Sequence, residues 1–181
     1  MFFKTLLIND LLTILPCIII SLIYIYLFVI NLIYLKIFYK VEYINREAIP
    51  KEGGYIFCSN HLSAIDPFFL ACAIKRECAF IAKAELFDNF FIRFVSKYFN
   101  IYPIKRGTGD IGAMRKAISL INNGEILVMF PEGTRSKDGK LLEGKSGVTL
   151  IAKKTGCRIV PCAINNKPHI FKKTKLIFGE P

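Results

Sequence analysis

Beyond residue 40, short apolar runs alternate regularly with amphipathic stretches. Each run is long enough for one strand, and each amphipathic stretch is long enough for one helix. Strands are expected at residues 41–44, 55–59, 79–82, 101–104, 126–130, 159–163 and 175–178. Helices are expected at residues 67–74, 85–98, 111–122 and 146–155, with Gly124 and Gly156 as their C-terminal stops. This alternation predicts an α/β domain with a mixed, largely parallel central sheet flanked by helices.

An uncharged segment precedes this domain. Residues 11–35 carry no charged side chain, and about 20 residues are enough for a helix to cross the hydrocarbon core of a bilayer. We therefore expect residues 1–40 to form an N-terminal hydrophobic membrane anchor and residues 41–181 to form one domain. Pro16 and Asn31 also allow a segment that bends and inserts into one leaflet, so spanning and re-entrant anchors both remain open. A buried core helix is the alternative to membrane insertion.

The residues that follow this segment indicate the compartment. Lys36, Lys40, Arg46 and Lys51 lie shortly after it, and by the positive-inside rule they place the domain on the cytoplasmic face of the membrane. The six cysteines include no CxxC pair, and most of them lie inside apolar runs. They are therefore expected to be buried thiols in a reducing compartment.

Charge and hydropathy restrict the class of partner. The formal net charge of +11 and the pI near 9.4 favour an acidic partner, such as nucleic acid, anionic lipid or a phosphorylated substrate. A mean hydropathy of +0.41 is high for a soluble nucleic-acid-binding protein, and the sequence has no zinc-finger, RNA-recognition or helix-turn-helix signature. We therefore expect membrane lipid and phosphate as partners, and no nucleic acid.

His61 and Asp66 are the first candidates for catalysis. On a regular helix, residues five positions apart point about 140° away from each other, so this pair can meet only across a turn. A strand that ends at residue 59, and a helix with Asp66 as its N-cap and Pro67 as its first residue, would supply that turn. The neutral imidazole could then accept a proton while the carboxylate fixes its tautomer. The alternative is an N-capping Asp66 beside a loop histidine with no catalytic role.

A second cluster follows the strand expected at residues 126–130, in the order Pro131, Glu132, Gly133, Thr134, Arg135. The glycine permits close approach of the backbone to a ligand, and the threonine offers a hydroxyl and an N–H group. The arginine offers a planar fork that suits a phosphate. Together these residues predict an anion site, and the alternative is a polar turn after a strand.

Further basic residues end other strands. Arg106 is a candidate for a second phosphate ligand, although a solvated strand end is the more common explanation for such a residue. Lys83 and Lys145 are weaker candidates of the same type. In α/β sheets, sites gather at the carboxyl ends of the strands, which is where His61, Arg106 and the 132–135 cluster are expected.

Other chemistries lack support. Ser63 is not part of a G-x-S-x-G elbow, so a serine-hydrolase nucleophile is not indicated. His61 and His169 are the two histidines, and neither an H-E-x-x-H motif nor clustered cysteines accompany them, so no metal is expected. The sequence also lacks a P-loop and a G-x-G-x-x-G motif, so no nucleotide cofactor is expected.

Four motifs in order resemble those of the glycerolipid acyltransferases. They are Asn60-His61 with Asp66, then residues 104–106, then residues 131–135, and then residues 159–161. Within this group the chain is most similar to the 1-acyl-sn-glycerol-3-phosphate acyltransferases, over about residues 41–181. Residues 41–181 would then be the acyltransferase domain.

The resemblance implies a reaction and a role for each matching residue. A fatty acyl group would pass from acyl-CoA or acyl-carrier protein to the sn-2 hydroxyl of lysophosphatidic acid, giving phosphatidic acid without a cofactor or a metal. His61 would be the general base and Asp66 would orient it. The sequence does not identify the oxyanion donors, for which backbone N–H groups near Ser63 are candidates. The acceptor site would consist of Arg106, Glu132, Gly133, Thr134 and Arg135.

The sequence departs from the family pattern at two points, and two alternative functions remain open. Members of the family usually carry an aromatic residue where this chain has Gly144, which weakens any role for Lys145. Related sequences usually continue beyond Pro181, so the chain is either a minimal member or incomplete at its C-terminus. The first alternative is a related acyltransferase acting on glycerol 3-phosphate or another lysophospholipid. The second is a non-catalytic membrane protein that binds anionic lipid.

Overall fold

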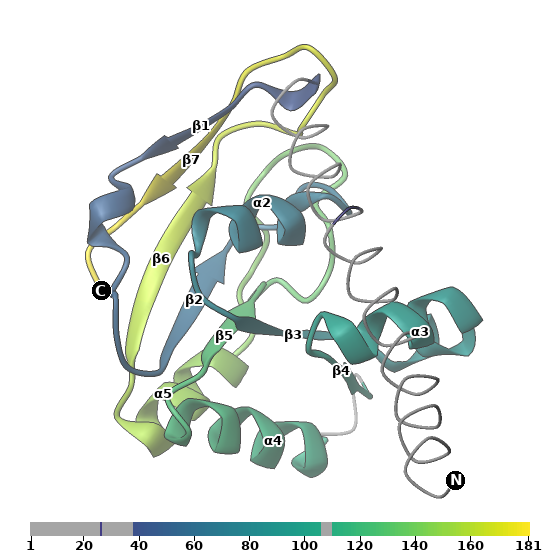
Figure 1. The fold of residues 1–181 in the computed structure, drawn as a ribbon, viewed down its shortest axis with the longest axis vertical. Helices are drawn as coiled ribbons and strands as arrows, with labels where there is room; N and C mark the ends of the chain where they lie inside the picture. Colours follow the sequence, from purple (N-terminus) through teal and green to yellow (C-terminus); the bar gives the residue numbers. More distant parts are fainter. Residues whose placement is uncertain (1–25, 27–37, 106–109) are drawn as a thin grey trace, which may run out of the picture.

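A seven-stranded sheet forms the centre of the protein, with strand order β1-β7-β6-β2-β5-β3-β4 (Figure 1). The structure is a computed structural model that describes residue 26 and residues 38–105 and 110–181. The strands are β1 (Val41–Ile44), β2 (Tyr55–Ser59), β3 (Cys78–Lys83), β4 (Ile101–Ile104), β5 (Ile126–Met129), β6 (Arg158–Ile164) and β7 (Thr174–Phe178). Each predicted strand is confirmed, with ends that differ by at most one residue.

Five neighbouring strands of the sheet run in the same direction. β6, β2, β5, β3 and β4 pair in parallel, whereas β7 is antiparallel to β6 and β1 is parallel to β7. The predicted mixed, largely parallel sheet is therefore confirmed. Because the five strands share a direction, the loops that follow them leave from one edge of the sheet.

Helices cover both faces of the sheet (Figure 1). They are α2 (Asp66–Ala73), α3 (Phe90–Tyr98), α4 (Ile111–Asn122) and α5 (Gly147–Thr155), with short 3₁₀ helices η1 (Arg46–Ala48) and η2 (Ala84–Asp88). Consecutive residues of a strand point to opposite faces, so the central strand β2 contributes to two cores. Phe57 packs in the cluster that contains α2, and Ile56 packs in the cluster that contains α4 and α5.

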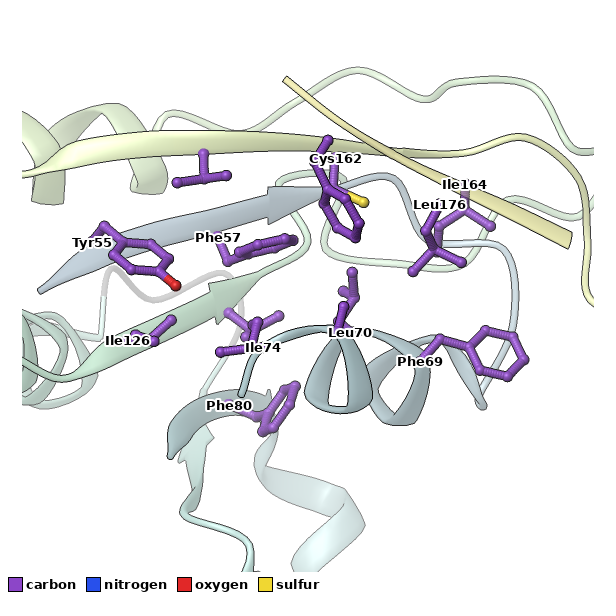
Figure 2. Close-up of a cluster of buried hydrophobic side chains, with 14 of the residues drawn as sticks. Tyr55, Phe57, Phe69, Leu70, Ile74, Phe80, Ile126, Cys162, Ile164 and Leu176 are labelled. Carbon is purple, nitrogen blue, oxygen red and sulfur yellow. The ribbon is translucent and has the colours of Figure 1, made fainter. Parts of the chain in front are cut away.

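The core on the α2 face fixes the position of that helix. Leu70 of α2 and Ile74, which follows the helix, point toward the strands, where Phe57 and Ile126 meet them (Figure 2). Leu70, Phe57 and Ile126 have no exposed surface, and burying each such side chain contributes about 1.5–3 kcal/mol. The helix that begins with Asp66 is thus held rigidly against the end of β2.

The prediction of one helix over residues 85–98 was wrong. Residues 85–98 do not form a single helix, since η2 ends at Asp88 and α3 begins at Phe90. Asn89 between them has an extended backbone, and its side-chain oxygen accepts a hydrogen bond from the N–H of Ile92 at 3.3 Å. Asparagine is a favoured N-capping residue, so it starts a new helix here although the apolar periodicity continues through it.

The predicted anchor at residues 1–40 lies almost entirely outside the described residues. Within the part of the chain that the structure describes, no helix has the length and apolar character needed to span a bilayer. The membrane anchor therefore stays a prediction from the sequence.

Candidate active site

His61 leaves the carboxyl end of β2, and Asn60 holds the chain in place just before it. The side-chain amide of Asn60 donates to the carbonyl of Ile164 at 3.0 Å, and its oxygen accepts from the N–H of Ile164 at 2.7 Å. This pair of bonds continues the pairing of β2 with β6, which ends at Ser59 and Cys162. His61 thus directly follows a residue that is hydrogen-bonded to β6.

Asp66 receives three hydrogen bonds on one carboxylate oxygen. Its Oδ2 lies 2.9 Å from Nδ1 of His61, and it accepts the N–H groups of Leu62 at 2.7 Å and Ser63 at 2.6 Å. The side chain is completely buried, so these donors replace the water that an ionised carboxylate would otherwise bind. The structure therefore brings together the two residues that the sequence singled out.

The prediction that Asp66 is the N-cap of its helix was wrong. The N-cap is Ile65, and Asp66 is the first residue of α2, with Pro67 following it. The carboxylate turns back toward the loop, because its Oδ2 binds N–H groups that precede the helix. Its task in the fold is therefore to hold the tight turn between His61 and α2.

This geometry sets the tautomer of His61. An ionised carboxylate has no proton to donate and can only accept a hydrogen bond. Nδ1 therefore carries the proton, and Nε2 keeps its lone pair. The imidazole side chain is 18% exposed, which leaves part of the ring open at the edge of the sheet. Nε2 is thus the atom that can take a proton from a substrate hydroxyl.

The loop after β5 packs directly against His61. The ring of Phe130 stacks on the imidazole, with centroids 4.1 Å apart and planes inclined by 21°. The N–H of Ser136 donates to the carbonyl oxygen of His61 at 2.8 Å. His61 is therefore fixed by Asp66 at one ring nitrogen and by Phe130 across one face.

The residues of the predicted anion site lie in this same loop. Gly133 has a positive φ of 66°, a backbone conformation that glycine adopts without strain. Thr134 and Arg135 are exposed, and none of the ion pairs found among the described residues involves Arg135. Its guanidinium is thus available to an anion.

Glu132 differs from its neighbours in the loop. It is 5% exposed, and within the described residues neither of its carboxylate oxygens has a hydrogen-bond partner. A buried carboxylate is costly when nothing pairs with it. The side chain of Glu132 therefore faces the protein interior rather than solvent.

The structure describes only one of the next two predicted basic residues, Arg106 and Lys83. Arg106 lies outside the described residues, so its place in the site stays a prediction. Lys83 ends β3 at the same edge of the sheet, and its ammonium pairs with Glu85 at 3.2 Å.

Two of the candidate oxyanion donors near Ser63 are already engaged. The N–H groups of Leu62 and Ser63 both donate to Asp66. A group that already donates to a buried carboxylate is not free to stabilise an oxyanion on the substrate.

The thiols of the domain are poor candidates for a nucleophile. Burial raises the pKa of Cys162 to about 12 and that of Cys78 to about 12, and it also raises the pKa of Cys58 on β2. The thiolate is the reactive form, so these side chains are mainly unreactive thiols near neutral pH. The predicted burial holds fully for Cys162, whereas Cys58, Cys72, Cys78 and Cys157 are half-buried.

Metal ligands do not gather in the described part of the chain. No group of three histidine, cysteine, aspartate or glutamate side chains there lies close enough to hold a metal ion.

Asn60 and Phe130 were not predicted as site residues. Asn60 stands immediately before His61 and belongs to the first of the four motifs, which are the signals that could have pointed to it. Nothing local marks Phe130, because its contact with His61 depends on the pairing of β2 with β5.

Replacing Asn60 with alanine should lower kcat about tenfold and destabilise the domain by about 1–3 kcal/mol, because two hydrogen bonds to Ile164 are lost. Enzyme kinetics and a thermal melt measure the two effects. Asn165→Ala is the matched control, since the side chain of Asn165 accepts a hydrogen bond from Lys175 instead. It should lower stability without lowering kcat, and equal loss of kcat in both variants would contradict a positioning role for Asn60.

This chain is similar to known acyltransferases. Residues 40–165 match the family model described as Acyltransferase. The chain is 31% identical over 147 residues to the 1-acyl-sn-glycerol-3-phosphate acyltransferase of Bacillus subtilis, covering 78% of this chain and 73% of that protein. It is 31% identical over 130 residues to a chloroplastic 1-acyl-sn-glycerol-3-phosphate acyltransferase of Arabidopsis thaliana, covering 70% of this chain and 36% of that protein.

A solved structure shows the same fold. It is the crystal structure of the 1-acyl-sn-glycerophosphate acyltransferase PlsC from Thermotoga maritima, with a TM-score of 0.66 and 32% sequence identity. The similarity covers 79% of this chain and 61% of that protein. The chain thus spans only part of the length of these relatives.

Proposed function

Since this chain belongs to the acyltransferase family, we propose that it transfers a fatty acyl group to the sn-2 hydroxyl of 1-acyl-sn-glycerol 3-phosphate. The product would be phosphatidic acid, and the donor would be an acyl thioester, either acyl-CoA or acyl-carrier protein. The names of the relatives from B. subtilis, A. thaliana and T. maritima support this acceptor. The thioester serves as co-substrate, and the proposed reaction uses no cofactor.

One observation carries the proposal. The buried carboxylate of Asp66 holds Nδ1 of His61 at 2.9 Å, so Nε2 is left as a base at the edge of the sheet, beside a loop that offers Arg135. A base next to an anion-binding group suits a substrate that carries both a hydroxyl and a phosphate. Lysophosphatidic acid has both.

The proposed reaction is direct acyl transfer. The hydroxyl of the acceptor gives its proton to Nε2 of His61 as its oxygen attacks the thioester carbonyl. The tetrahedral intermediate then expels the sulfur, which takes the proton from the imidazolium and leaves as a thiol. Asp66 stabilises the imidazolium between these two steps. General-base catalysis of this kind contributes about 10²–10⁴-fold, and positioning of the two substrates contributes the rest.

The phosphate of the acceptor would be held by the predicted anion site. In this proposal Arg135 provides the planar fork, while Gly133 and Thr134 provide backbone approach and a hydroxyl. Arg106 would be a further phosphate ligand, and Glu132 would form part of the wall of the site.

The sequence also supports a location for the reaction. We propose that residues 1–40 anchor the protein in the membrane and that residues 41–181 form the acyltransferase domain on the cytoplasmic face. The uncharged segment at residues 11–35 and the net charge of +11 support contact with anionic lipid. The acceptor could then enter the site with its acyl chain still in the bilayer.

Purified full-length protein in detergent tests the proposal. It should be supplied with lysophosphatidic acid, glycerol 3-phosphate or lysophosphatidylcholine, each with acyl-CoA and with acyl-carrier protein. We expect phosphatidic acid as the main product, formed with the highest kcat/KM from lysophosphatidic acid. Faster acylation of glycerol 3-phosphate or lysophosphatidylcholine would overturn the acceptor, and lipid binding without any acyl transfer would overturn the enzyme.

Replacing Arg135 with lysine should raise KM for lysophosphatidic acid about tenfold and leave KM for the acyl donor unchanged, because a point charge cannot replace a bidentate fork. Steady-state kinetics with each substrate varied in turn measures this. Arg158→Lys is the matched control, since Arg158 begins β6 at the opposite edge of the sheet. An unchanged acceptor KM would exclude Arg135 from the phosphate site.

A further inference from the structure

Lys145 lies directly over Gly133, although the sequence made it a weak candidate. Its N–H donates to the carbonyl of Pro131 at 2.9 Å, so its backbone is tied to the loop that carries the anion site. A Cβ atom on Gly133 would lie 3.3 Å from both Cε and Nζ of Lys145. The end of the lysine side chain thus occupies the space that the glycine leaves open.

The ammonium of Lys145 is also available to a ligand. Among the described residues, none of the ion pairs involves Lys145. Glu132 is adjacent to Gly133 in the chain, but it is buried whereas Lys145 is exposed. A cation held over the Gly133 backbone, with no counter-ion among the described residues, is well placed to receive an anion.

We propose that Lys145 binds the acceptor phosphate from the Gly133 side and selects a phosphomonoester over a phosphodiester. This inference rests on the proposed function and adds a determinant of specificity to it. A phosphomonoester carries close to two negative charges at neutral pH, and a headgroup phosphodiester carries one. Because electrostatic attraction scales with the product of the charges, a second cation favours the more highly charged acceptor. Gly133 would be needed for the space it leaves to the lysine as well as for its backbone conformation.

Lys145→Met is the first test, since methionine keeps an unbranched apolar stem without the charge. With lysophosphatidic acid and lysophosphatidylglycerol as competing acceptors, the preference for the phosphomonoester should fall about tenfold. The fall should come from a higher KM for lysophosphatidic acid, with KM for the acyl donor unchanged. Lys140→Met is the control, because the side chain of Lys140 is 83% exposed in the same loop region and pairs with Asp138.

A double-mutant cycle tests the link between the lysine and the glycine. Gly133→Ala should raise the acceptor KM, because the new methyl group displaces the ammonium. In the Lys145→Met background the same substitution should raise it much less, since no ammonium is left to displace. Equal effects of Gly133→Ala in both backgrounds would show that Gly133 does not position Lys145, and would overturn that part of the proposal.

Binding of a soluble ligand separates this inference from the proposed function. Isothermal titration calorimetry of the full chain in detergent should show that Lys145→Met raises Kd for glycerol 3-phosphate about tenfold. Binding of glycerophosphocholine, a phosphodiester, should change much less. If the protein binds the phosphomonoester through Lys145 but transfers no acyl group, the proposed function fails and the inference holds. If it acylates lysophosphatidic acid while Lys145→Met leaves KM, Kd and preference unchanged, the inference fails alone.

Discussion

Replacing His61 with alanine should lower kcat for acyl transfer about 10³-fold, because the substitution removes the only base that Asp66 orients. Loss of a general base costs about 10²–10⁴-fold when substrate binding is kept. KM for lysophosphatidic acid should change little, since the phosphate is held by the loop after β5. Initial rates of phosphatidic acid formation with saturating acyl donor measure the effect.

His169→Ala is the matched control, since His169 is the second histidine of the chain and lies exposed in the loop before β7. Its kcat should equal that of the unaltered protein. Thermal melts of both variants check that the fold is kept. If His61→Ala retains full acyl transfer while remaining folded, His61 is not the base, and direct transfer by this dyad is excluded.

Replacing Asp66 with alanine should cause the largest loss of stability of any substitution proposed here, about 3 kcal/mol or more. The change removes one oxygen that accepts hydrogen bonds from Leu62, Ser63 and His61. The two backbone N–H groups would be left buried without a partner, and each such loss costs about 1–3 kcal/mol. Chemical denaturation followed by circular dichroism measures the change.

Asp66→Asn separates stability from catalysis. Its amide oxygen can still accept the two backbone N–H groups, so most of the stability should remain. An amide carries no charge to stabilise the imidazolium, so kcat should still fall about 10²-fold or more. Asp138→Ala is the stability control, because Asp138 is exposed and the melting midpoint should move little. An Asp66→Asn variant with full kcat would reduce Asp66 to a structural residue.

The α/β architecture was predictable because it depends on local patterns. The apolar run at residues 55–59 has the length of a strand buried on both faces, and it became β2 at the centre of the sheet. The helix at residues 111–122 was predicted with both ends correct. Periodicity failed at Asn89, whose side chain accepts a hydrogen bond from the N–H of Ile92 and starts a new helix within one apolar pattern.

The dyad was predictable in part. A spacing of five residues and an Asp-Pro pair required a turn between His61 and Asp66, and the structure contains that turn. The direction of the carboxylate was not predictable, because a first-turn aspartate can bind its own helix or the loop before it. Burial of Asp66 beneath the loop decided the matter, and it also removed Leu62 and Ser63 from the set of possible oxyanion donors.

The sequence by itself determined the strands, the order of the chemical groups and the edge of the sheet where they lie, since these follow from periodicity and from local spacing. Only the tertiary structure decided which groups touch. Phe130 stacks on His61, Asn60 bonds to Ile164, and Lys145 covers Gly133. The first two contacts join segments of different strands and so depend on which strands are neighbours, whereas the third forms within the long loop between β5 and α5. Strand order is a property of the whole packed sheet, so no local pattern encodes it.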